Sequence, residues 1–277
     1  MSGQADRDYL LGTHDEELAR LGIQHRVWRP IVLDCWHRAG VTVGSRVLDV
    51  GAGPGFATVD LAEIVGPTGE VVAVERSARY VRAAAAACEQ RGFRHARVQE
   101  LDLMADPIPA GALDAAWCRW VACFVSSPRA LVAKIARALR PGGVAIFHEY
   151  VDYASWQFAP PVPAHREFVR EVMANWRAAG GEPDIAPALV GMLVEAGFVI
   201  REAVPRVFCI RPRDYAWQWP ASFLAVHPER LLELGRVSPD FVERLRREAR
   251  AAEANAGTLM ITPMVLEIIA ERAAGPH

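Results

Sequence analysis

The segment from residue 46 to residue 150 constrains the fold most, because short β-rich runs alternate there with short helical segments. Strands are predicted at residues 46–50, 70–74, 96–101, 113–121 and 144–150, and helices at 56–64, 78–90 and 128–139. Glycine and proline separate several of these segments, as in Gly66-Pro67-Thr68-Gly69. This alternation predicts βαβ units and a mostly parallel sheet that helices cover on both faces.

The flanking regions are less regular. Residues 1–40 have a helical pattern that Pro30 is expected to break or kink. Helices are predicted at 164–179 and 185–196, and an extended run at 198–210, before a tryptophan-rich stretch at 215–220. Ser238-Pro239-Asp240 is typical of a helix start, and residues 259–269 predict a last strand, with Pro263 at an edge or bulge.

Composition and charge exclude several classes of protein. The chain has 277 residues, of which 52% are hydrophobic, so it can bury a large core and is not a disordered protein. A formal net charge of −2 argues against a strongly basic nucleic-acid surface. No apolar stretch is long enough for a membrane span, and the first residues show no secretory signal. We therefore expect a cytoplasmic protein that binds neither nucleic acid nor membrane.

The most informative motif is the stretch from Val47 to Gly55, which lies between a predicted strand and a predicted helix. Gly51, Gly53 and Gly55 allow positive φ angles and let the backbone approach a ligand closely. The following helix directs its amide groups and its positive dipole end toward that ligand. Glu75 ends the second predicted strand, where a carboxylate can accept hydrogen bonds from ribose hydroxyls. Together these features predict an adenosine-containing cofactor at the carboxyl ends of the strands.

The details of the motif distinguish between cofactors. Dinucleotide binding needs the motif G-x-G-x-x-G. Here the third glycine comes one residue early, and Phe56 occupies the position where that motif requires a glycine. Asp49 suits a cofactor with an amino group and a sulfonium better than one with a pyrophosphate. The motif resembles that of the class I S-adenosylmethionine-dependent methyltransferases. A nicotinamide oxidoreductase is therefore disfavoured.

The resemblance covers about residues 40–150 and implies roles for further residues. It makes Glu75 the ribose-binding acid and Asp102 the residue near the adenine amino group, with Leu139-Arg140-Pro141-Gly142-Gly143 as the turn before the fifth strand. Arg119, at the end of the fourth strand, is expected to contact the cofactor pocket, as is Trp28 in the N-terminal helix. Arg76 and Leu103 are also included among the predicted cofactor-binding residues. For single residues, a helix cap, a solvated strand end or a turn remains an alternative.

Candidate catalytic residues end the fifth predicted strand. His148 and Glu149 lie where an acceptor would meet the cofactor, and because side chains alternate they should face opposite sides of the sheet. Either could act as a base, although methyl transfer needs one only for some acceptors. A packed histidine and a hydrogen-bonded carboxylate are the alternative interpretation. No H-x-x-x-H pair or carboxylate cluster appears near the predicted site, so no metal site is expected.

These observations predict a Rossmann-like seven-stranded sheet with an N-terminal helical segment at 1–40. The methyltransferase domain should span 41–277 and carry a helical lid at about 211–257. We expect methyl transfer from S-adenosyl-L-methionine, leaving S-adenosyl-L-homocysteine, to O, N or C of a small metabolite or natural product. An apolar or aromatic acceptor is suggested by Trp156, Trp176, Trp217 and Trp219. Methylation of protein or RNA, or a catalytically silent cofactor-binding protein, remain alternatives, and the oligomeric state stays open.

Overall fold

The computed structural model describes residues 15–108 and 111–274, which form two compact units. Unit 1 comprises residues 15–28, 150–184 and 205–265. Unit 2 comprises residues 29–108, 111–149, 185–204 and 266–274. Among the described helices, none is both long and apolar enough to cross a membrane.

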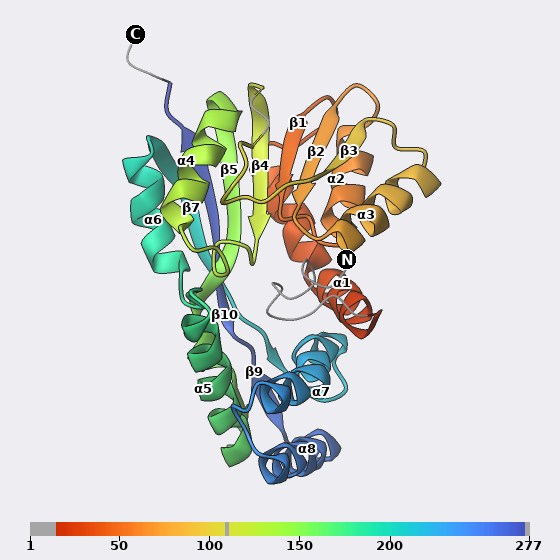
Figure 1. Ribbon diagram of the computed structural model, residues 1–277, viewed down its shortest axis with the longest axis vertical. Helices are drawn as coiled ribbons and strands as arrows, with labels where there is room; N and C mark the ends of the chain where they lie inside the picture. Colours follow the sequence, from red (N-terminus) through yellow and green to blue (C-terminus); the bar gives the residue numbers. More distant parts are fainter. Residues whose placement is uncertain (1–14, 109–110, 275–277) are drawn as a thin grey trace, which may run out of the picture. The chain divides into compact units, whose positions relative to one another are not determined.

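Unit 2 is built on a seven-stranded sheet with the order β3-β2-β1-β4-β5-β10-β7 (Figure 1). Its strands are β1 (Arg46–Val50), β2 (Glu70–Glu75), β3 (Ala96–Glu100), β4 (Leu113–Arg119), β5 (Leu139–Asp152), β7 (Phe198–Arg206) and β10 (Met264–Arg272). The strands β1 to β5 pair in parallel, so their carboxyl ends lie at one edge of the sheet. In this register Asp49 pairs with Trp117, and Arg119 pairs with His148. The predicted seven-stranded α/β architecture is confirmed.

The helices of unit 2 include the three that the sequence pattern predicts between its first five strands. They are α2 (Phe56–Val65), α3 (Ala78–Gln90), α4 (Pro128–Ala138), α6 (Ala186–Glu195) and the second half of α1 (Asp15–Arg38). Ser77 and Ser127 cap α3 and α4 by accepting a backbone N–H in the first turn. On α1, Trp36 packs edge-on against Trp117 of β4 at 5.2 Å between ring centres. The end of α1 therefore covers the sheet face that carries Trp117.

Unit 1 combines a small antiparallel sheet with three packed helices. The sheet has the order β6-β9-β8, formed by β6 (Gln157–Ala159), β9 (Leu259–Ile261) and β8 (Cys209–Ile210). The helices α5 (Pro163–Ala178), α7 (Gln218–Glu233) and α8 (Pro239–Ala254) contact one another. Two 3₁₀ turns complete the unit, η1 (Tyr153–Ser155) and η2 (Tyr215–Trp217). Its core is aromatic, with Trp156 edge-on against His165 at 4.6 Å.

The helix α1 runs through Pro30 without a break, which leaves a kink as the expectation there. Two predicted boundaries are wrong, and one of them involves proline. The predicted strand 259–269 splits at Pro263, which has no N–H for a ladder bond, and its parts β9 and β10 join different sheets. The strand β5 begins at Leu139 instead of residue 144, because Leu139 already pairs with Leu113 of β4.

Candidate cofactor and active site

The turn between β1 and α2 depends on three glycines with left-handed backbones. Their φ angles are 66° at Gly51, 56° at Gly53 and 87° at Gly55. A Cβ atom at Gly51 or Gly55 would lie 2.5 Å from a side-chain atom of Val121 or Ala84, so packing excludes a side chain at both positions. A Cβ at Gly53 would meet nothing within 4 Å among the described atoms. The turn therefore exposes its backbone at Gly53, as close approach to a ligand requires.

Glu75, at the end of β2, holds this turn in place. Its carboxylate accepts the N–H of Gly53 and the N–H of Ser77, each at 2.9 Å. The residue is buried. An ionised carboxylate offers about four lone-pair positions. Two amide bonds therefore leave acceptor capacity for hydroxyl groups of a ligand.

Asp49 is a second buried carboxylate, placed at the carboxyl end of β1. Its Oδ2 accepts the Thr58 hydroxyl at 2.7 Å, a contact that the sequence analysis did not foresee. Burial raises the pKa of Asp49 to about 6. The Thr58 hydroxyl and the positive charge of Arg119 lower this pKa, whereas the negative charge of Glu75 raises it further. Asp49, Glu75 and Arg119 therefore share one electrostatic environment.

The end of β4 is strained and aromatic. The guanidinium of Arg119 lies over the rings of Trp117 and Trp120, at 5.7 and 5.2 Å from their centres. Trp120 has a φ of 51°, a left-handed conformation that costs a non-glycine residue about 1–2 kcal/mol. Its N–H donates to the carbonyl of His148 at 2.9 Å, which fixes this turn to β5. Strained backbone of this kind is concentrated at functional sites.

Asp102 and Leu103 lie in the segment that follows β3. The N–H of Leu101 donates to the carbonyl of Glu75 at 2.9 Å and so brings this segment to the end of β2. The exposed carboxylate of Asp102 accepts the N–H of Met104 at 2.7 Å, which makes it a turn former as well as a candidate ligand contact. Leu103 is buried. The predicted roles of both residues stay predictions.

Arg76 and Trp28 are the remaining predicted cofactor contacts. Arg76 is exposed and directly follows Glu75. Trp28 belongs to unit 1, where it is fully buried and packs edge-on against Phe208 and Trp219 at 5.2 and 5.1 Å. The contacts of Arg76 and Trp28 with a cofactor likewise stay predictions.

His148 and Glu149 are both fully buried near the end of β5. Glu149 accepts the N–H groups of Val121 and Ala122, each at 2.8 Å, and thereby ties the turn after β4 to β5. Burial raises the pKa of Glu149 to about 7, against the lowering effect of these hydrogen bonds. A carboxyl group with such a pKa is matched to proton transfer near neutral pH. Whether either residue acts as a base stays a prediction.

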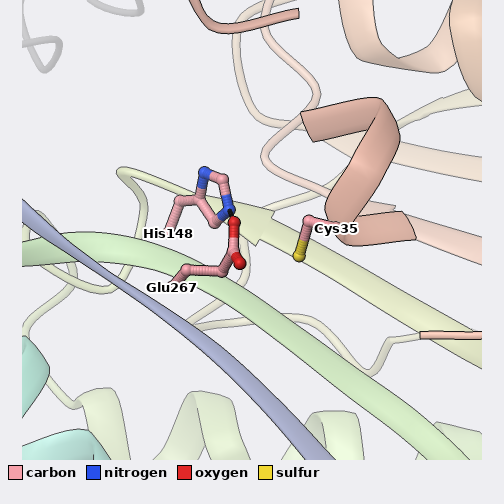
Figure 2. Close-up of side chains that lie close together, drawn as sticks. All are labelled: Cys35, His148 and Glu267. Carbon is pink, nitrogen blue, oxygen red and sulfur yellow. Dashed lines mark hydrogen bonds and ion pairs between the residues drawn. The ribbon is translucent and has the colours of Figure 1, made fainter. Parts of the chain in front are cut away.

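His148 is one of three polar side chains that come together from separate elements (Figure 2). The His148 Nε2 lies 2.9 Å from an oxygen of Glu267 on β10, and Cys35 of α1 completes the group within 4.8 Å. Arg38 pairs with the other oxygen of Glu267 and with Glu202 on β7. These residue types can bind a metal ion, but here both oxygens of the Glu267 carboxylate already have partners, one in His148 and one in Arg38. We interpret the group as an ion-pair cluster that fastens α1, β5, β7 and β10 together.

Comparison with known proteins connects this geometry to a family. A family model described as a methyltransferase domain matches residues 47–143, which include the glycine turn and Glu75. Nocamycin O-methyltransferase from Saccharothrix syringae is 29% identical over 248 residues, covering 84% of this chain and 81% of that enzyme. A ubiquinone/menaquinone biosynthesis C-methyltransferase from Erwinia tasmaniensis is 28% identical over 145 residues, covering 52% of this chain and 55% of that enzyme. The chain thus spans about half the length of some curated relatives that it matches.

Solved structures share the fold at lower sequence identity. The YcgJ protein from Bacillus subtilis matches with a TM-score of 0.58 and 17% identity, covering 91% of this chain and 100% of that one. The [4+2]-cyclase SpnF matches with a TM-score of 0.56 and 20% identity, covering 89% and 82%. These structures support the fold alone, whereas the matched domain and the curated relatives support the class of enzyme. The sheet order, the methyltransferase domain matched over residues 47–143 and the curated relatives together support an S-adenosylmethionine-dependent methyltransferase.

Proposed function

We propose that this chain transfers a methyl group from S-adenosyl-L-methionine to a small organic acceptor. The observation that carries the proposal is the β1–α2 turn, which is open at Gly53 and flanked by the buried carboxylates of Asp49 and Glu75. A nucleoside with a charged amino-acid tail offers hydroxyl and ammonium donors to these two acceptors. The residues present therefore fit this cofactor.

Each side chain around the turn has a distinct part in the proposal. Glu75 would accept hydrogen bonds from the ribose hydroxyls with the lone pairs that Gly53 and Ser77 leave unused. Asp49 would favour the cationic methionine end, and Asp102 would accept the adenine amino group. When bound, S-adenosyl-L-methionine supplies a methyl group attached to a sulfonium. Once the methyl group has been transferred, the leaving group is a neutral thioether.

Positioning is the main catalytic task of the protein in this proposal. Correct alignment of two reactants can contribute roughly 7–11 kcal/mol to lowering the barrier. A base is required only where the acceptor loses a proton. Of these two residues, Glu149 has the more suitable chemistry for a base, because burial raises its pKa to about 7. His148 has its Nε2 paired with Glu267 and would act mainly through the position of its ring.

A small natural product is the acceptor that the relatives favour. Nocamycin O-methyltransferase and the quinone C-methyltransferase are named for small molecules, and the first aligns with most of this chain. The match to a [4+2]-cyclase keeps a cofactor-binding protein without methyl transfer as the alternative, since one fold can host several chemistries. An apolar or aromatic acceptor stays part of the proposal, although the four tryptophans that suggest it are all buried in unit 1, namely Trp156, Trp176, Trp217 and Trp219.

Methyl transfer is tested with S-adenosyl-L-methionine carrying a labelled methyl group and a panel of phenols, carboxylic acids and quinols. The expected result is label in a small-molecule product with wild-type protein and a large loss with Glu75→Ala. A matched control is Glu70→Ala, which removes a β2 carboxylate that pairs with Arg46 on the sheet. Binding of S-adenosyl-L-homocysteine without label transfer to any acceptor would favour the silent cofactor-binding protein.

A further inference from the structure

Unit 1 contains a cavity of about 250 Å³, and none of its lining residues is among the predicted cofactor contacts. Its base is formed by four buried apolar side chains, Phe158, Trp217, Leu224 and Met260. These residues come from β6, η2, α7 and β9. Aromatic rings and the thioether of Met260 therefore form much of the cavity surface, which suits a flat apolar molecule.

The cavity exists because small residues line two neighbouring helices. Ala221 and Ala225 lie one turn apart on α7, and Ala249 lies on α8, which packs against α7. Methyl groups at these positions leave space that larger side chains would fill at normal packing density. An engineered apolar cavity of about 150 Å³ binds benzene. The larger volume here therefore has room for a fused or substituted ring.

Charged side chains of α8 stand at the rim. Glu253 accepts the indole N–H of Trp217 at 3.1 Å, and Arg246 pairs with Glu229 at 2.6 Å. Arg250 is exposed and forms no ion pair within the described part of the chain. The charged lining residues are two guanidinium groups, Arg246 and Arg250, and one carboxylate, Glu253, so the lining carries a net positive charge. Charge complementarity therefore favours a negative group at this opening.

We propose that the cavity between α7 and α8 binds an apolar carboxylate, with its ring on Phe158, Trp217 and Met260 and its carboxylate at Arg250. The proposal goes beyond the methyl transfer proposed above and does not depend on it, because no lining residue belongs to the cofactor site. A neutral or cationic molecule of the same shape lacks the ion pair and binds more weakly.

The test is a titration of the full chain with 2-naphthoate, followed by tryptophan fluorescence and by calorimetry. The neutral 2-naphthalenemethanol serves as the uncharged comparison. Arg250→Gln should weaken naphthoate binding by roughly fivefold, the size of one partly exposed ion pair. The matched control Arg247→Gln removes an exposed guanidinium of α8 that does not line the cavity and should leave binding unchanged.

A cavity-filling variant, Ala249→Leu, should abolish binding while leaving the affinity for S-adenosyl-L-homocysteine unchanged. The proposal is overturned if naphthoate does not bind, if it binds no better than the neutral alcohol, or if Arg250→Gln and Arg247→Gln behave alike. The Arg250→Gln result is decisive even if Ala249→Leu fails to fold, because Arg250 is exposed and supports no contact in the core. If the wild-type protein binds S-adenosyl-L-homocysteine but not naphthoate, this inference is refuted and the proposed function still stands.

Discussion

Acidification should destabilise unit 1, because two of its histidines are buried as neutral rings. His165 is fully buried between Trp156 and Phe158, at 4.6 and 4.7 Å between ring centres. Neither of its ring nitrogens has a hydrogen-bond partner among the described residues. His227 stacks on Phe223 at 4.4 Å. Burial lowers the pKa of each ring from 6.5 to about 3. Neither environment offers the compensation that a buried imidazolium needs.

The size of the effect follows from proton linkage. Because the folded pKa lies below the unfolded value, each ring stabilises the fold fully above 6.5, and this contribution is lost as the pH falls from 6.5 toward 3. At about pH 5 each histidine should cost roughly 2 kcal/mol relative to neutral pH, so the pair should cost roughly 4 kcal/mol. That is a large part of a typical folding free energy of about 5–15 kcal/mol.

The assay is urea unfolding followed by tryptophan fluorescence at several pH values between neutral and about pH 5. His165→Phe replaces the ring by an aromatic without a titrating nitrogen, so between neutral pH and about pH 5 its free energy of unfolding should fall by roughly 2 kcal/mol less than that of the wild type. His37→Gln, at an exposed position on α1, is the control. If the free energy of unfolding of His165→Phe falls with pH in parallel with that of the wild type, the reasoning is refuted.

Four further predictions concern the cofactor site. Gly53→Val should keep the fold, at the cost of backbone strain at its positive φ, and lose S-adenosyl-L-homocysteine binding. Gly55→Val has the same strain and in addition a clash of its Cβ with Ala84 on α3, so its melting temperature should be much lower than that of Gly53→Val, and equal melting temperatures would contradict this. Glu75→Ala should weaken cofactor binding by about 1.5–3 kcal/mol in calorimetry, and unchanged affinity would remove its assigned role. Burial raises the pKa of Asp49 to about 6, so cofactor affinity should fall below that pH, and Asp49→Asn should abolish this dependence. Glu149→Gln should fold, because its amide oxygen still accepts the two N–H groups of Val121 and Ala122. Any change of activity with pH near 7 should disappear in this variant, and an unchanged pH profile would restrict Glu149 to a positioning role.

Local signals made the α/β core predictable from the sequence. Glycine turns and serine caps mark where each strand or helix begins, so the strand at 46–50 and the helix at 78–90 have the predicted bounds. The glycine spacing likewise identified Asp49 and Glu75 as neighbours of one turn. These features depend on residues a few positions apart, which a single sequence displays directly.

Long-range pairings were not predictable in the same way. Glu267 meets His148 across 119 positions, and no local motif announces their contact with Arg38. The amide contacts of Glu149 and the split of the last strand at Pro263 depend on which strands become neighbours. The periodicity within a segment indicates its type, but not its partner in a sheet.

The most direct test of the account is a calorimetric titration of the purified chain with S-adenosyl-L-homocysteine, with NAD as the control ligand. Both ligands contain adenosine, but only the first has the amino-acid end that Asp49 is proposed to favour. The account predicts saturable one-to-one binding of S-adenosyl-L-homocysteine, no heat from NAD, and no binding of either ligand to Gly53→Val. Binding of NAD alone, or of S-adenosyl-L-homocysteine with equal affinity to wild type and Gly53→Val, would contradict the assignment of the site.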